Sequence, residues 1–153
     1  MQVRRAEATD AAEVARLLVD FNNEFHTPTP PPDVLRQRLE LLLRQVTTAA
    51  FVVGESPVGL ALLTSRTNVW HNGPVVMLDE LYVAPAHRNR RLGSALLAAA
   101  ETWAMSVGAE LLEIDVDGGD ADARRFYERH GYGCVPPGEP EPSLRYFREL
   151  TGA

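Results

Sequence analysis

The chain has 153 residues, of which 45% are apolar and 24% are charged, a composition typical of one globular domain. Its net charge of −6 argues against broad electrostatic binding of nucleic acid. No stretch approaches the roughly 18 to 20 uninterrupted apolar residues that a membrane helix needs, and the segment Met1–Glu7 has no hydrophobic signal core. We therefore expect a single domain over residues 1–153, located in the cytoplasm, without a membrane or nucleic-acid partner.

Cysteine and lysine usage excludes several kinds of chemistry. Cys134 is the one cysteine, so the chain can form neither an internal disulfide nor a cysteine-based metal cluster. We interpret it as a small buried or half-buried apolar residue, because no activating base lies near it in the sequence. The chain contains no lysine, which excludes a Schiff-base or P-loop lysine. Four histidines are scattered without the spacing of metal ligands, so we expect no metal.

The first third of the chain predicts one short strand and two helices. Val3–Arg5 is typical of a strand, and a helix follows from Thr9 and Asp10, which are good capping residues, to about Phe25. Pro32–Val46 predicts a second helix, because a proline suits the first turn of a helix. The proline-rich segment between these helices is too stiff to be helical and predicts an extended connection.

The remainder predicts strands with two intervening helices. Strands are expected at Ala49–Val53, Val58–Thr64, Val75–Val83, Glu110–Val116, Tyr132–Val135 and Leu144–Leu150. Helices are expected at Leu92–Val107 and Ala121–His130, the second ending at Gly131. The strand–helix–strand order over 75–116 implies one parallel crossover. The predicted fold is α/β, with a mixed sheet of about seven strands flanked by about four helices.

An arginine-rich turn joins the strand that ends at Val83 to the helix that begins at Leu92. This geometry aims backbone N–H groups and the positive end of a helix at one point, where a phosphate binds well. Gly93 removes a side chain where the backbone must approach a ligand closely. A solvated basic turn is the alternative, and the pattern matches neither a P-loop nor a dinucleotide fingerprint. The arginines concerned are Arg88, Arg90 and Arg91.

These residues resemble the signature of the GNAT N-acetyltransferases: Gln or Arg, two residues, Gly, one residue, then Gly or Ala. Arg88 fills the first position and Gly93 the last, whereas Arg91 stands in place of the first glycine. We expect the backbone at Arg91 to suit a residue with a β-carbon, so that the loop is shaped slightly differently.

A second signature of the same family is an alanine followed by an aromatic–tyrosine pair and a Gly–aromatic pair. The segment Ala123–Tyr132 has this pattern, with Phe126–Tyr127 as the aromatic pair. Asp120 replaces the asparagine that often opens the segment. The two signatures have the family's order and separation, and the resemblance covers Met77–Tyr132.

The resemblance implies that acetyl-coenzyme A is the co-substrate. Its pyrophosphate would lie on the backbone of the turn, and its pantetheine arm would run along the preceding strand, where the sheet splays between the fourth and fifth strands. The implied coenzyme-binding residues are Leu81, Tyr82, Val83, Arg88, Asn89, Arg90, Arg91, Leu92, Gly93, Ser94, Asp120 and Phe126.

Two residues are expected to move protons. The amine must lose a proton, and Asp79 and Glu80 are carboxylates in an otherwise apolar strand, where burial is costly unless they are paired or used. Alternation along a strand predicts that they point to opposite faces. We favour Glu80 as the base by resemblance, with a structural hydrogen bond or ion pair as the alternative. The resemblance also makes Tyr127 the acid that protonates the leaving thiolate.

The acceptor is predicted less sharply, as a primary amine of a small molecule or a peptide end. Acidic and aromatic residues near the expected slot would suit a cationic amine; they are Phe21, Glu24, Trp70, Asp79 and Asp115. The alternative function is a non-catalytic acyl-coenzyme A binding module. Many members of the family dimerise, so a homodimer is also an open expectation.

Overall fold

The computed structural model describes residues 1–151, which divide into two compact units. The first unit is Met1–Ile114 and the second begins at Asp115. The units are described separately below, and the single domain expected from the sequence stays a prediction. No helix within residues 1–151 is long and apolar enough to cross a membrane.

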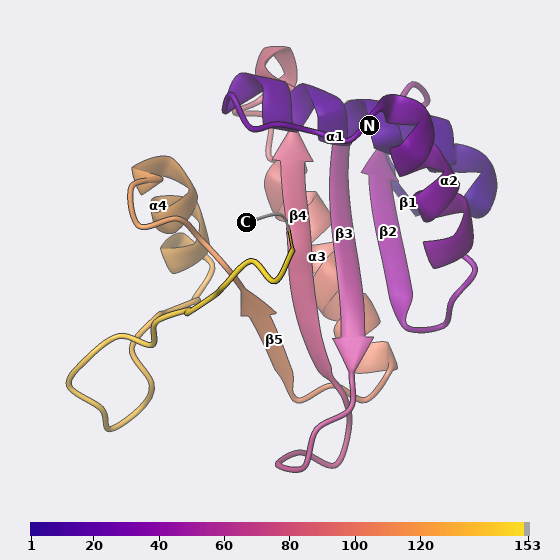
Figure 1. Cartoon of the computed structure of the whole chain (residues 1–153). Helices are drawn as coiled ribbons and strands as arrows, with labels where there is room; N and C mark the ends of the chain where they lie inside the picture. Colours follow the sequence, from indigo (N-terminus) through magenta and orange to yellow (C-terminus); the bar gives the residue numbers. More distant parts are fainter. Residues whose placement is uncertain (152–153) are drawn as a thin grey trace. The chain divides into compact units, whose positions relative to one another are not determined.

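The first unit is built on one mixed sheet with the strand order β1-β2-β3-β4-β5 (Figure 1). The first four strands pair antiparallel, and β5 joins β4 in parallel after the crossover through α3. The strands are β1 (Val3–Arg5), β2 (Thr48–Val53), β3 (Gly59–Arg66), β4 (Val75–Val83) and β5 (Leu111–Ile114).

Helices cover both faces of this sheet. On one face lie α1 (Ala11–Glu24) and α2 (Pro32–Leu42), and on the other lies α3 (Leu92–Ser106) (Figure 1). Val14 and Leu17 of α1 are fully buried in one core cluster with Leu60 and Tyr82 of the sheet. Two short 3₁₀ helices, η1 (Ala8–Asp10) and η2 (Pro85–His87), precede α1 and follow β4.

The predicted second helix ends four residues early, at Leu42 rather than Val46. The N–H groups of Arg44 and Gln45 bond to the carbonyls three residues before them, which tightens the chain into a turn. Because Thr48 must already enter β2, tertiary pairing ends the helix although no glycine or proline does.

The second unit contains α4 (Ala121–Arg129), which completes the four predicted α-helices. The two strands predicted at Tyr132–Val135 and Leu144–Leu150 are wrong, because neither segment forms a strand in the described residues. The Ser143 N–H donates to the Cys134 carbonyl at 2.7 Å, and Cys134 is exposed, so the expectation that it is buried or half-buried is wrong. An alternating apolar pattern is typical of a strand, but a segment forms a strand only when its backbone makes a ladder of hydrogen bonds with a neighbouring strand. The sheet therefore has five strands rather than about seven.

Candidate active site

The edge of β4 is where the site begins. β5 pairs with β4 only from Val75 to Leu78, whereas β3 pairs along β4 as far as Val83. Within the first unit, the segment 79–83 therefore has a strand partner on one edge alone. This is the splay between the fourth and fifth strands that the sequence predicts.

A β-bulge interrupts β4 at the point where the splay starts. Leu62 pairs with Glu80 and Leu63 with Leu78, so Asp79 is the extra residue of the bulge. Leu62 packs against the core under α1 and α2, which places Glu80 on that face. Thr64 lies two residues after Leu62 in β3 and therefore on the same face, and its hydroxyl donates to Asp79 at 2.8 Å. The expectation that the two acids point to opposite faces is thus wrong, because the bulge breaks the alternation.

Burial gives Glu80 unusual acid–base behaviour. Its half-buried carboxylate loses hydration, and the nearby charge of Asp79 adds repulsion, so that its pKa rises from 4.5 to about 6. A carboxylate with a pKa near 6 is ionised at neutral pH and still basic enough to accept a proton. Thr64, which contacts the neighbouring acid, carries no signal in the sequence, because its role depends on strand register.

The arginine turn has a left-handed backbone at two positions. Asn89 and Arg91 both have φ of 61°, a conformation that asparagine tolerates but arginine rarely adopts. The expectation that position 91 suits a residue with a β-carbon is wrong, because Arg91 adopts the conformation that glycine favours. Arg91 is also the N-cap of α3, and its side chain makes no capping hydrogen bond. Its first N–H groups face the turn, as an anion site requires.

Arg88 is held by a residue from another element. Its two terminal nitrogens donate to the Glu24 carboxylate at 2.7 Å each, and its Nε donates to the Val83 carbonyl at 2.9 Å. The guanidinium also lies 5.8 Å from the ring centre of Tyr82, which stacks on Phe21 at 5.1 Å. The structure thus brings together five predicted site residues, but Glu24 faces an arginine and Phe21 and Tyr82 belong to the core.

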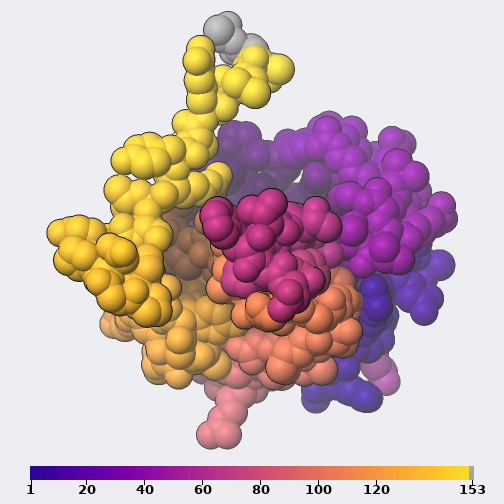
Figure 2. Space-filling view, turned by 90° about the horizontal axis from the view of Figure 1, so that it is seen from below, coloured from indigo at the N-terminus to yellow at the C-terminus, as the bar shows by residue number. Residues whose placement is uncertain are grey.

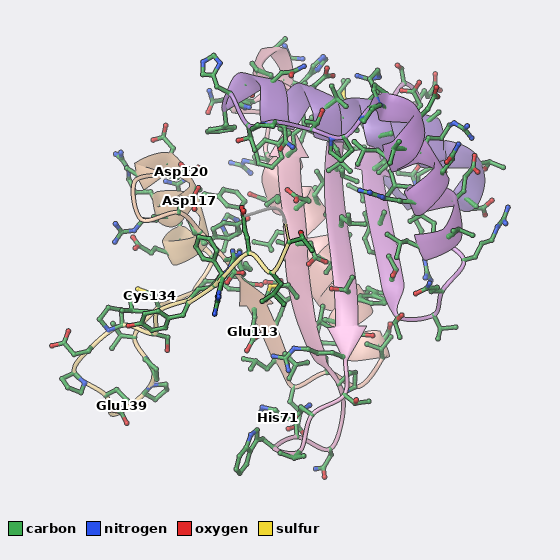
Figure 3. The ribbon with its side chains drawn as sticks, viewed as in Figure 1. His71, Glu113, Asp117, Asp120, Cys134 and Glu139 are labelled. Atoms are coloured by element: carbon green, nitrogen blue, oxygen red, sulfur yellow. The ribbon has the colours of Figure 1, made fainter. Side chains whose placement is uncertain are left out.

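Trp70 does not join this group. It lies in the loop between β3 and β4, whereas the arginine turn follows the far end of β4 (Figure 1). The loop stands nearest the viewer in Figure 2, and Trp70 is 87% exposed. The adjacent His71, labelled in Figure 3, contacts the Glu110 carboxylate at 3.2 Å and ties the loop to the start of β5.

The second unit holds the remaining predicted residues. Asp120, labelled in Figure 3, caps α4 by accepting the Ala123 N–H at 2.9 Å. The Tyr127 ring is half-buried between Phe126 and Tyr132, with ring centres 5.2 and 5.9 Å away. In the same unit, Asp115 pairs with Arg145 at 3.2 Å. The site roles of Asp115, Asp120, Phe126 and Tyr127 stay predictions.

The splayed edge of the sheet and the turn at the start of α3 are the features that the sequence analysis expects of an acyltransferase, and comparison with known proteins supports this class. The sequence profile of the acetyltransferase (GNAT) family matches residues 11–132. The chain belongs to this family and with it to the acyltransferase enzymes.

Individual relatives agree with this assignment. A structure from Arthrobacter sp. FB24, provisionally described as an acetyltransferase, is 53% identical, with a TM-score of 0.92 over 98% of this chain and 96% of that one. The aminoalkylphosphonate N-acetyltransferase of Salmonella typhimurium is 40% identical over 75 residues. That match spans about half of each chain, 49% in both cases. AAC(6')-Iy, solved with the bisubstrate analogue CoA-S-monomethyl-acetylneamine, has the same fold: 21% identity and a TM-score of 0.76, over 97% of both chains.

Proposed function

We propose that this protein transfers an acetyl group from acetyl-coenzyme A to a primary amine of a small molecule or peptide, by direct attack in a ternary complex. The observation that carries the proposal is the one-sided edge of β4 at 79–83, which leads directly into the left-handed turn and the uncapped start of α3. An extended arm and an anionic group of one ligand could occupy these two features in succession.

The residues of the turn fit a coenzyme A pyrophosphate. Leu81 offers backbone groups, and Val83 offers its N–H, on the edge that β5 leaves without a strand; the Val83 carbonyl already accepts from Arg88. The backbone of Leu92 and Gly93 starts a helix whose cap has no side-chain acceptor. Arg90 and Arg91 are exposed and add positive charge to a chain that is otherwise acidic. Donors and charge therefore converge on the same end of α3.

The chemistry needs one base and one acid from the chain, while acetyl-coenzyme A supplies the activated acetyl thioester. Glu80 accepts a proton from the amine, directly or through water, as nitrogen bonds to the acetyl carbon. The carbon–sulfur bond then breaks, and Tyr127 gives a proton to the departing thiolate. The raised pKa of Glu80, about 6, supports this assignment because a purely structural surface acid would not need it.

The acceptor is an amine because of the charge around Glu80. Asp79 and Glu80 lie on one face and together attract a cation while one of them deprotonates it. Two similar proteins point the same way: one is named for an aminoalkylphosphonate, and another was solved with a neamine-based analogue. Phe21 and Asp115 stay candidates for the acceptor side. A homodimer and a cytoplasmic location stay predictions of the sequence analysis.

Titration with acetyl-coenzyme A, followed by thiol release against a panel of amines, tests the proposal. Micromolar binding and thiol release that depends on one class of amine are the expected results. Binding without release in the presence of any amine would instead support the non-catalytic binding module. No binding of coenzyme A or acetyl-coenzyme A would overturn the proposal itself.

A further inference from the structure

The turn that binds the coenzyme in the proposed function has a strained backbone. Its backbone passes through two left-handed residues, Asn89 and Arg91, and each is intrinsically less stable than an ordinary helical or extended residue. At the two ends of the turn, the Arg88 N–H donates to the Pro85 carbonyl at 3.3 Å and the Ala95 N–H donates to the Arg91 carbonyl at 3.0 Å. Such a turn needs an anchor from elsewhere to keep one shape.

Glu24 supplies that anchor from the last residue of α1. Its two carboxylate oxygens accept from both terminal nitrogens of Arg88, in the planar two-bond geometry that is strongest for this pair. The Nε of Arg88 reaches back to the Val83 carbonyl, so the same side chain bridges α1, the end of β4 and the turn. Figure 1 shows the end of α1 beside the segment that follows β4.

The ion pair between Glu24 and Arg88 also determines which arginines of the turn can attract a phosphate. The charge of Arg88 is matched by Glu24 at contact distance, and Tyr82 lies against the guanidinium. Arg90 and Arg91 are exposed on the same turn, and no carboxylate partner is described for either of them among residues 1–151. The positive potential of the turn therefore comes mainly from Arg90 and Arg91.

We propose that Glu24 is a positioning residue, which shapes the coenzyme-binding turn through Arg88, and that Arg88 serves the turn as an anchor rather than as a phosphate ligand. This rests on the proposed function of the turn. It replaces the expectation that Glu24 binds the acceptor amine, because its carboxylate is already engaged by an arginine at 2.7 Å.

The first test needs no coenzyme. Amide hydrogen exchange is compared at Arg88 and Ala95, whose N–H groups bond to carbonyls at the two ends of the turn, in the parent, in Glu24→Gln and in Asp10→Asn. The control breaks an equally two-bonded pair, Arg4 with Asp10, at 2.9 and 2.7 Å and far from the turn in sequence. We expect exchange of the turn amides to rise about fivefold in Glu24→Gln and to stay at the parent value in the control. Equal exchange at these amides in all three proteins would overturn the proposal.

The second test separates an anchor from a ligand. For an anchor, Glu24→Gln and Arg88→Gln each weaken coenzyme A binding about fivefold, and the double variant is no weaker than either one. The KM for acetyl-coenzyme A rises to match, while kcat at saturation stays within about twofold of the parent. The exchanged pair Glu24→Arg with Arg88→Glu recovers part of the affinity, because the ion pair forms in reverse while the bond from Arg88 Nε to the Val83 carbonyl is lost.

If Arg88 instead binds the phosphate directly, the affinities of the variants follow the opposite pattern. Arg88→Gln then weakens binding, Glu24→Gln leaves it unchanged or tighter, and the exchanged pair does not recover; this result rejects the anchor. If the parent binds no coenzyme A, the proposed function fails, and hydrogen exchange still decides whether Glu24 positions the turn.

Discussion

Asp79 and Glu80 are consecutive residues whose side chains lie on the same face of the sheet. A regular strand would send them to opposite faces, but Asp79 is the extra residue of the bulge and bonds to Thr64 beside Leu62. The charge of Asp79 therefore acts on Glu80 at close range and adds to the effect of burial on the Glu80 pKa. Two predictions about pH follow from this arrangement.

Glu80→Gln removes the proposed base. Because the Glu80 pKa is about 6, kcat/KM of the parent should fall as the pH drops below 6 and the carboxylate becomes protonated. The variant should lose this acid limb and retain about 1% of the parent activity at pH 7. A pH–rate series from 5 to 9 measures both effects. Asp79→Asn is the matched control: it removes only the neighbouring charge, so the limb persists and moves to lower pH.

The raised pKa of Glu80 also makes the free energy of unfolding depend on pH. This pKa is about 6 in the folded protein and 4.5 in the unfolded chain, so the folded state holds more protons between these values. The free energy of unfolding should therefore decrease as the pH rises from 4.5 to 6. Allowing for the solvent contact of Glu80, we expect a loss of about 1 kcal/mol. Urea unfolding at several pH values should show this slope in the parent and a flatter one in Glu80→Gln.

Tyr127→Phe tests the proposed acid. Removing one hydroxyl should lower kcat about 10- to 100-fold and leave the Kd of coenzyme A nearly unchanged, since the ring and its contacts with Phe126 and Tyr132 remain. Tyr132→Phe removes a hydroxyl from the neighbouring ring and should keep turnover near the parent. An unchanged kcat in Tyr127→Phe would remove Tyr127 from the mechanism.

Arg91→Gly tests the cost of a side chain in the left-handed turn. The variant should be more stable by up to about 1 kcal/mol, which corresponds to a Tm increase of about 2–4 °C for a chain of this size. Loss of one positive charge should weaken coenzyme A binding at the same time. Asn89→Gly has the same φ of 61° but should gain less, because asparagine tolerates this conformation. A lower Tm in Arg91→Gly would show that the side chain stabilises the turn.

The sequence predicts the elements of the first unit closely. The bounds of β1 and β4 match the predicted strands, and α3 starts at Leu92 as expected. These elements have strong local patterns: an apolar run, a proline or glycine at a boundary, or helical spacing of apolar residues. The prediction of two strands near the C-terminus was wrong because it used a local pattern alone. Their side-chain pattern is local, but a strand exists only when a neighbour supplies hydrogen bonds.

In the candidate site, too, local features were predicted from the sequence and long-range contacts were not. The arginine turn and the acids of β4 were visible in sequence because glycine, arginine and buried carboxylates are unusual in those settings. The contact of Arg88 with Glu24 was not visible, because it joins residues 64 positions apart. The Thr64 contact was hidden too, since a bulge between distant strands aligns that hydroxyl with Asp79.

The sequence by itself therefore determined the family, the order of the central elements and the stretch proposed to bind the coenzyme, because each is encoded by residues close together in the chain. Only the tertiary structure decided that Asp79 and Glu80 share a face and that Glu24 holds an arginine rather than standing ready for an amine. Strand register and side-chain pairing depend on which distant segments pack together, and that choice is made by the burial of the whole core rather than by any local pattern.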